Sequence, residues 1–214
     1  MEILFQDNRV LVAVKPAGVR STDEPGGVPE LLRQQLGDPR ACVRTVHRLD
    51  QVVGGAMVLA RSRKAAQLLS EQVRDGRFQK QYLAVVTGDP PEQGTLRDLL
   101  LRDRSRRMTL VVEEPGPEVK EALLDYRILD RREGLSLAEI RLHTGRTHQI
   151  RVQFASRGWP LWGDQKYGGA AGERIGLWSR QVSFLHPQTG ERLTLRAPLP
   201  RCAPWTLFPR EAEP

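Results

Sequence analysis

Apolar positions alternate with polar ones in several short stretches of the chain, which is the pattern of β-strands. Between Ile3 and Val14 aliphatic residues flank a polar turn at Gln6–Arg9, which predicts a β-hairpin. Further strands are predicted at residues 43–46, 56–60, 82–87, 108–112, 120–129 and 135–142, and two more at 177–199 around a turn at His186–Gly190. Strands therefore dominate the expected fold.

Helical spacing is less common. Helices are predicted at Glu30–Leu36, at Ser62–Arg74, and from near Thr147, whose hydroxyl can cap the first turn, to Gly158. We expect Gly54-Gly55 to form a turn between two strands, residues 94–107 to be irregular and Arg-rich, and residues 198–214 to form a Pro-punctuated end. Because no linker or repeat interrupts the pattern, residues 1–214 are expected to form a single α+β domain on a mixed, mainly antiparallel sheet.

The composition is that of a soluble globular protein. The 214 residues are 39% hydrophobic and 28% charged, which argues against a disordered, collagen-like or coiled-coil chain. No apolar run approaches the roughly 20 residues that a membrane span needs. The acidic, quickly polar N-terminus resembles no targeting peptide, so we expect a cytoplasmic protein that is not bound to a membrane.

The charge balance points to a polyanionic partner. Lys and Arg number 33 against 26 acidic residues, which gives a net charge of +7, and 28 of these cations are Arg. Guanidinium groups bind phosphates through two parallel hydrogen bonds and stack on bases, so this preference suits a nucleic acid. A GC-rich genome would favour Arg codons equally well, and composition alone leaves both explanations open.

Residues typical of metal or nucleotide sites are sparse. Cys42 and Cys202 lie far apart and are expected to be buried, inert thiols. The four histidines show no metal-ligand spacing, and neither GxGxxG nor a P-loop occurs. We therefore expect no metal site and no nucleotide cofactor.

A first candidate for chemistry is the segment His47–Asp50, which follows a predicted strand. The Arg48 guanidinium could keep the Asp50 carboxylate ionised and oriented, although such a pair is more often a structural ion pair. The four residues also superficially resemble the catalytic loop of protein kinases. That interpretation fails because Gly55 stands where the kinase Asn is required.

Two further segments carry candidate binding residues. Residues 140–163 contain four Arg and two His but no acid, so the predicted helix start could bind a phosphate or carboxylate, or could be a solvated basic face. Tyr82 lies in an apolar strand, where a core position is the more common role and stacking on a base is the alternative.

The order of these segments is more specific than any one of them. In sequence they are Lys15-Pro16-Ala17-Gly18, His47-Arg48-Leu49-Asp50, Lys80–Ala84, Thr144–Arg151, Gly163-Asp164-Gln165-Lys166-Tyr167-Gly168, Ser183–Pro187 and Ala197–Pro200. In this order the chain closely resembles the RluA-type family of RNA pseudouridine synthases, from about Ile3 to Leu199. The resemblance implies the catalytic fold of that family, an α+β domain with a central cleft across its mixed sheet.

The resemblance also implies roles for residues at matching positions. Asp50 matches the catalytic aspartate, and Arg48 matches the arginine that enters the RNA helix as the target uridine flips out. Tyr82 matches the tyrosine that stacks on the target base. Arg151, with Arg146 as the less certain choice, matches the basic partner of the aspartate, and Ile150 matches an apolar pocket residue.

The implied activity is the isomerisation of one uridine to pseudouridine in structured rRNA or tRNA, with no cofactor, by a monomer. The alternatives are a catalytically silent RNA-binding or RNA-folding protein that uses the same cleft, and a glycosidase that releases uracil. Nucleophilic attack by Asp50 and removal of the 2′ proton both remain open as its role.

The chain departs from the family pattern in three places. Gln51-Val52-Val53 replaces the usual Lys, acidic residue and Thr or Ser after the aspartate, and Leu177-Trp178-Ser179 replaces Leu-His-Ala. Many relatives carry an N-terminal S4 RNA-binding module, for which this chain has no room before Ile3. We therefore expect the catalytic domain itself, or helper proteins, to select the substrate.

Overall fold

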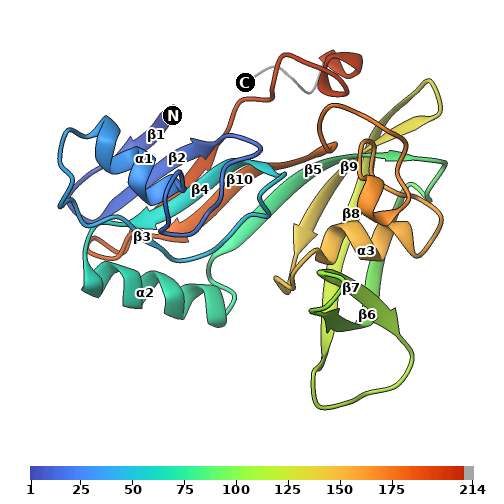
Figure 1. The fold of residues 1–214 in the computed structure, drawn as a ribbon, viewed down its shortest axis with the longest axis horizontal. Helices are drawn as coiled ribbons and strands as arrows, with labels where there is room; N and C mark the ends of the chain where they lie inside the picture. The colour runs from blue at the N-terminus through green and yellow to red at the C-terminus, as the bar shows by residue number, and fades with distance from the viewer. Residues whose placement is uncertain (210–214) are drawn as a thin grey trace. The chain divides into compact units, whose positions relative to one another are not determined.

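The computed structural model describes residues 1–209, and its contacts divide the chain into two compact units (Figure 1). Unit 1 comprises residues 1–81 and 178–199, and unit 2 comprises residues 82–177 and the chain from residue 200 onward. Each unit is thus assembled from two separate segments of the sequence. The last part of the predicted Pro-punctuated end, residues 210–214, lies outside the described residues.

Unit 1 is built on a mixed sheet. Its strands are β1 (Ile3–Gln6), β2 (Val10–Lys15), β3 (Arg44–Thr45), β4 (Gly54–Ala60), β10 (Leu177–Leu185) and β11 (Arg192–Arg196). They pair in the order β1-β2-β4-β10-β11, and β3 adds to β4. Only β4 and β10 run parallel; the other pairs are antiparallel. The predicted hairpins at the two ends of the sequence are confirmed as β1–β2 and β10–β11.

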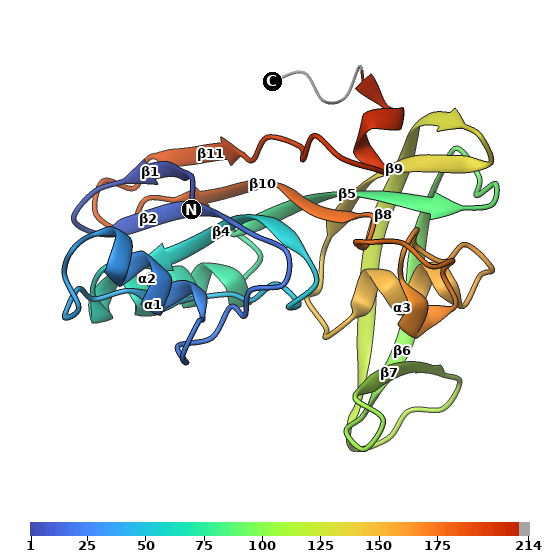
Figure 2. The ribbon, with the colours of Figure 1, turned by 45° about the horizontal axis from the view of Figure 1, so that its top comes forward.

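Two helices cover one face of this sheet. Figure 2 shows α1 (Val28–Gln35) and α2 (Arg63–Arg74) beneath the strands. The Ser62 hydroxyl accepts a hydrogen bond from the Ala65 N–H at 3.1 Å and caps α2. All seven residues of β4 are buried, because this strand lies between β2 and β10 and is covered by the helices.

The two consecutive glycines belong to β4 and do not form the predicted turn. A Cβ on Gly54 would lie 2.3 Å from the Trp178 ring, and one on Gly55 would lie 2.3 Å from the Ser179 carbonyl oxygen. Gly55 also has a φ of +117°. The glycines are therefore explained by the close approach of β10 to β4.

Unit 2 consists mainly of long antiparallel strands. They are β5 (Gln79–Thr87), whose first three residues belong to unit 1, β6 (Gln93–Asp103), β7 (Met108–Val112), β8 (Val119–Arg132) and β9 (Leu135–Leu142). Their order is β5-β9-β8-β6-β7. The predicted ranges of β7 and β9 agree with the structure.

The prediction of irregular structure at residues 94–107 is wrong for most of that range, which forms β6. Nine consecutive residues of β6, from Gln93 to Leu101, pair with β8, and β7 pairs along its other edge. Leu96 and Leu100 are buried while Arg97 between them is exposed. Arg97 lies on the exposed face, whereas Asp98 lies on the same face as the two leucines and accepts hydrogen bonds from Gln153 and Arg157, which obscured the alternation in the sequence.

A short helix packs against β6 and β7 of unit 2. It is α3 (Gln149–Ala155), and two 3₁₀ turns follow, η1 (Gln165–Tyr167) and η2 (Trp205–Leu207). A mixed sheet with few helices confirms the α+β class. Within residues 1–209 no helix is long and apolar enough to cross a membrane.

Candidate active site

In unit 1 the candidate residues Arg48 and Asp50 lie on the loop that joins β3 to β4. Along this loop the side chains alternate: His47 and Leu49 are buried, Arg48 is exposed and Asp50 is half-buried. The two apolar or neutral members thus anchor the loop, while the two charged members face outward. Because of this alternation, two of the four residues pack inside unit 1 while the other two remain accessible for a reaction.

His47 has a structural role. Its Nε2 accepts a hydrogen bond from the Val58 N–H at 3.0 Å, and its ring lies 5.1 Å from the ring of Phe78. Burial, assisted by the positive charge of Lys80, lowers the pKa of His47 to about 3. The imidazole is therefore neutral at physiological pH and ties the loop to β4.

The KPAG segment holds the residue that follows Asp50. The Lys15 ammonium is fully buried and donates to the carbonyl oxygens of Pro16, Val19 and Gln51 at 2.9, 2.6 and 3.1 Å. The Gln51 carbonyl also accepts the Gly18 N–H at 2.7 Å, and the Gln51 side-chain amide donates to the Gly18 carbonyl at 3.0 Å. Both the backbone and the side chain of Gln51 are thus fixed on this turn.

Burial lowers the pKa of Lys15 to about 8, and the negative charge of Asp50 acts in the opposite direction. The protonation of the Lys15 amine therefore depends on the charge of the candidate catalytic carboxylate. No role for Lys15 was predicted from the sequence. The KPAG motif was the available signal, but the carbonyl at Gln51 lies too far along the chain for local spacing to reveal the contact.

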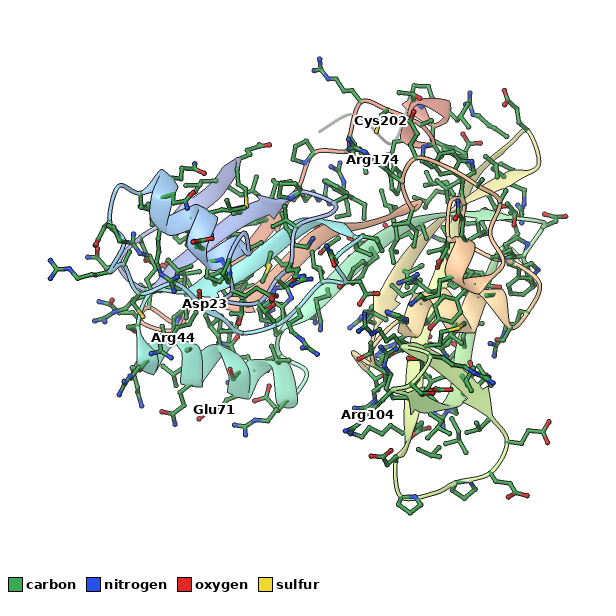
Figure 3. All side chains as sticks on the ribbon, viewed as in Figure 1. Asp23, Arg44, Glu71, Arg104, Arg174 and Cys202 are labelled. Atoms are coloured by element: carbon green, nitrogen blue, oxygen red, sulfur yellow. The ribbon has the colours of Figure 1, made fainter. Side chains whose placement is uncertain are left out.

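A hollow of about 530 Å³ in unit 1 is lined by residues 39–45, which lead into β3, together with Asp23 and Arg33. Asp23 and Arg44, both labelled in Figure 3, lie among its lining residues together with Arg33 and Arg40. Arg33 donates two hydrogen bonds to the Asp23 carboxylate, which lower the pKa of Asp23. Arg40 and Arg44 are exposed, so they give the hollow a positive surface.

In unit 2 three candidate residues are buried. Tyr82 on β5 is 6% exposed, and Ile150 and Arg151 on α3 are 4% and 6% exposed. Arg151 donates from Nε and Nη2 to the two carboxylate oxygens of Asp164, each at 2.7 Å. Asp164 belongs to the Gly163–Gly168 motif, but its partner Arg151 lies thirteen residues away, so the pair was not predicted from the sequence.

The turn that leads into α3 is held by side chains, but not by the predicted cap. The Gln149 Oε1 accepts hydrogen bonds from the Thr144 hydroxyl at 2.8 Å and the Arg146 N–H at 3.0 Å. The helix begins two residues later than Thr147, behind His148, whose φ of +56° is left-handed, and no side-chain cap is present. The Thr147 cap was therefore wrong. The exposed Arg146 donates from Nε to the Glu121 carbonyl at 2.9 Å.

Carboxylates from other elements partly neutralise the cationic run at residues 140–163. Besides Asp164 on Arg151, Asp98 pairs with Arg157 at 2.9 Å, and Asp125 contacts His143 at 2.6 Å. The hydrogen bonds from His143 and Thr95 lower the pKa of Asp125. The run contains only cations when it is read along the sequence. In the folded protein, acidic partners from β6, β8 and the segment after α3 lie beside it.

The structure places Arg48 and Asp50 on one loop of unit 1, and Arg146, Ile150 and Arg151 on one turn and helix of unit 2. Tyr82 lies on β5. The assembly of these residues into one catalytic centre stays a prediction.

Cys42 and Cys202 are free and half-buried, so the prediction that both are buried is wrong. In the described part of the chain no group of three or more His, Cys, Asp or Glu side chains could hold a metal ion.

The fold and these motifs have known counterparts. The model of the family described as RNA pseudouridylate synthase matches residues 9–156. An uncharacterised RNA pseudouridine synthase of Bacillus subtilis, YhcT, is 36% identical over 94% of this chain and 69% of its own length. Ribosomal large subunit pseudouridine synthase D of Xanthomonas campestris is 35% identical over 94% of this chain and 66% of its own length. This chain thus spans about two thirds of these relatives.

Solved structures agree on the fold. Human RNA pseudouridylate synthase domain containing 4 superposes with a TM-score of 0.78 at 24% identity, covering 94% of this chain and 89% of its own. Human RNA pseudouridylate synthase domain containing 1 gives 0.77 at 22% identity, covering 100% and 95%. The expected catalytic fold is thereby confirmed, and the extent of the sequence matches shows that the chain belongs to the RNA pseudouridine synthase family.

Proposed function

We propose that this chain isomerises a specific uridine to pseudouridine in a structured RNA, with Asp50 as the catalytic carboxylate. Membership of an RNA pseudouridine synthase family supports the reaction class. One relative is named for the ribosomal large subunit, which supports ribosomal RNA as the first substrate to examine. Transfer RNA is the second.

The observation that carries the proposal is the fixed position of Asp50. Both of its chain neighbours are held by hydrogen bonds, Leu49 through Ser21 and Gln51 through Lys15, while Asp50 itself is half-buried and so reachable. A catalytic group that is held before the substrate binds loses little entropy in the reaction. Asp50 is also the only acid between Asp38 and Glu71 in the sequence.

The chemistry needs only one such carboxylate. The C1′–N1 bond of uridine breaks, the uracil turns, C5 bonds to C1′, and the C5 proton is lost as N1 gains one. The product is an isomer, so no oxidant, reductant or water is consumed, and we propose that no cofactor takes part. Asp50 acts either by attacking C1′ or by removing the 2′ proton, whereas glycosidases usually use two carboxylates to activate water.

The other candidate residues have supporting roles in this proposal. Arg48, exposed beside Asp50, enters the space left by the flipped nucleotide. Flipping costs a few kcal/mol, which phosphate contacts and stacking can offset. Tyr82 provides the surface on which the detached uracil rests, and Ile150 lines the pocket. Arg151 pairs with the Asp50 carboxylate, and Arg146 contacts the RNA.

We further propose that the protein works as a cytoplasmic monomer. Its free thiols fit a reducing compartment. The large hydrophobic side chains that are exposed among residues 1–209 are Val52 and Val111, and isolated residues of this kind do not form an association surface. Light scattering of the purified protein at micromolar concentration should give the mass of one chain, and a dimer mass would contradict this.

The decisive test compares pseudouridine in cellular RNA before and after incubation with the protein. RNA from a strain that lacks the gene should gain pseudouridine at one or a few positions with the wild type and at none with Asp50→Asn. Asp50→Asn should bind the same RNA within about threefold of the wild type, because the substitution preserves size. The control Asp38→Asn changes the nearest upstream acid, which is exposed, and should retain activity.

The same experiment separates the alternatives. A catalytically silent RNA-binding protein would bind the RNA without any pseudouridine appearing. A glycosidase would release free uracil and leave an abasic position. If Asp50→Asn were as active as the wild type, Asp50 would have no place in the mechanism.

A further inference from the structure

The segment Gly163–Gly168 of unit 2 is a motif that the proposed mechanism leaves without a role. Its backbone is tightly held: the Asp164 N–H donates to Leu161 at 3.1 Å, and the Asp164 carbonyl accepts from Tyr167 and Gly169 at 3.0 and 2.9 Å. A Cβ on Gly163, whose φ is +73°, would lie 2.1 Å from the Arg174 carbonyl oxygen. The segment therefore presents Asp164 and Tyr167 in a fixed arrangement.

Asp164 binds one edge of the Arg151 guanidinium. Its side chain is 1% exposed and that of Arg151 is 7% exposed. The two parallel hydrogen bonds, each of 2.7 Å, use Nε and Nη2 of Arg151. Because a guanidinium is planar, this fork also fixes the direction in which Nη1 points.

Tyr167 covers a face of the same guanidinium. The Arg151 Cζ lies 5.1 Å from the centre of the Tyr167 ring, which is within the range of a cation–π contact. The Tyr167 hydroxyl accepts the Thr109 N–H at 2.8 Å and lies 2.7 Å from His148 Nδ1. Burial raises the pKa of Tyr167, so the phenol stays neutral and keeps both contacts.

This arrangement restricts the guanidinium more than stability requires. Burying an ion pair removes two charges from water, and replacing such a pair with apolar residues is often neutral or stabilising. Unit 2 contains a useful contrast in Asp98, which binds Arg157 through two hydrogen bonds at 2.9 and 3.1 Å. Arg157 is 28% exposed and lies just after the end of α3.

We propose that Asp164 and Tyr167 are positioning residues that hold the Arg151 guanidinium in the orientation needed for isomerisation. This inference rests on the proposed function, since only the isomerisation requires the Arg151 guanidinium to have a particular orientation. Asp164 is bound edge to edge with Arg151, and Tyr167 lies over its face. Neither residue needs to contact RNA.

The test measures the single-turnover rate of pseudouridine formation at saturating RNA, RNA affinity and the thermal midpoint for matched variants. Asp164→Asn should lower the rate by about 100-fold, the loss expected for a displacement of about 1 Å, and leave RNA affinity within about threefold. Asp98→Asn, which breaks the comparison pair, should lower the midpoint to a similar degree and leave the rate within about threefold.

A double-mutant cycle distinguishes positioning from a general structural effect. If Asp164 acts through Arg151, then Arg151→Gln together with Asp164→Asn should be no slower than Arg151→Gln alone. The proposal would be overturned if the rate loss of the double variant equalled the product of the losses of the two single variants. The double variant also removes both buried charges, so it avoids the uncompensated charge that Asp164→Asn leaves.

Tyr167 supplies the test if Asp164→Asn does not fold. Tyr167→Leu removes the ring and should lower the rate by about tenfold, with RNA affinity unchanged, whereas Tyr167→Phe keeps the ring and should retain more activity than Tyr167→Leu. An unchanged rate in Tyr167→Leu would overturn the proposal, as would an unchanged rate in folded Asp164→Asn. If the wild type forms no pseudouridine, the proposed function fails and this inference fails with it. An active wild type beside equally active variants defeats this inference alone.

Discussion

The hydroxyl of Ser21 closes a two-way contact with the backbone of Leu49. The Ser21 O–H donates to the Leu49 carbonyl at 2.7 Å, and the same oxygen accepts the Leu49 N–H at 3.1 Å. Ser21 is 4% exposed, so water cannot readily replace either hydrogen bond. One side chain thus determines the path of the loop between Arg48 and Asp50.

Ser21→Ala should therefore impair catalysis more than RNA binding. The substitution leaves a buried N–H and a buried carbonyl without this partner, which should cost about 1–3 kcal/mol of unfolding free energy. Turnover should fall at least about tenfold because the carboxylate loses its fixed position, while RNA affinity stays within about threefold. Urea unfolding, a binding titration and single-turnover rates would check these values.

Ser179→Ala is the matched control for Ser21→Ala. Ser179 is also buried in unit 1, and its hydroxyl donates to the Ala56 carbonyl at 3.0 Å, within the sheet. A comparable loss of stability with nearly unchanged turnover is expected. Equal losses of turnover in both variants would show that Ser21 acts only through overall stability.

Lys15 should make stability depend on pH. Its pKa is about 8 in the folded protein, below the ordinary 10.5, so between these values the unfolded chain holds a proton that the folded protein has released. The unfolding free energy contributed by this group therefore rises with pH across that window and is lowest below about pH 8. The full difference corresponds to about 3 kcal/mol.

Urea unfolding between about pH 7.5 and 9.5 would reveal this slope, and Lys64→Met, at an exposed position on α2, should preserve it. Asp50→Asn removes the negative charge that raises the pKa of Lys15. The rise in stability should then begin at a lower pH. An unshifted curve would show that Lys15 and Asp50 do not interact.

Gly55→Ala should disrupt unit 1. The new Cβ would lie 2.3 Å from the Ser179 carbonyl oxygen, at a φ of +117° that disfavours any side chain. A loss of more than about 3 kcal/mol of unfolding free energy is expected, enough to reduce the yield of folded protein. Gly190→Ala, at a φ of +74° with nothing within 4 Å, should cost only about 1–2 kcal/mol. Similar thermal midpoints for the two variants would contradict the close approach of β10 to β4.

RNA affinity should fall steeply with salt. The net charge is +7, and each phosphate that an arginine neutralises releases counterions. Arg44→Gln should reduce the slope of log affinity against log salt by about one if its guanidinium binds a phosphate, whereas Arg74→Gln, at the end of α2, should not. Filter binding at several salt concentrations would measure both slopes. A salt-independent affinity would exclude phosphate contacts as a main source of binding.

Local patterns predicted the elements whose apolar spacing is unambiguous. The predictions of the β1–β2 hairpin, β7, β9 and α2 agree with the structure. The prediction failed at β6, because Asp98 lies on its buried face and finds its partners on and just after α3. It failed at Gly54, because the reason for that glycine is the distant Trp178 ring.

The candidate site shows the same division. Asp50 and Arg48 were identified because their motif consists of consecutive residues. Lys15, Ser21 and Asp164 were not assigned roles because their partners lie 36, 28 and 13 residues away. Spacing along a chain predicts which residues share an element, but not which loops meet once the sheet has formed.

The parallel pairing of β4 with β10 has a consequence for synthesis. Gly54 pairs with Trp178, so the ribosome must complete unit 2 through Leu177 before the strand that covers this edge of β4 emerges. Until then this edge of a wholly apolar strand is paired only by β3, at Leu59 and Ala60, and its open part invites pairing with other nascent chains. Messages truncated before codon 178 should therefore yield aggregating fragments, whereas a circular permutant that begins at β10 would supply the missing strand first.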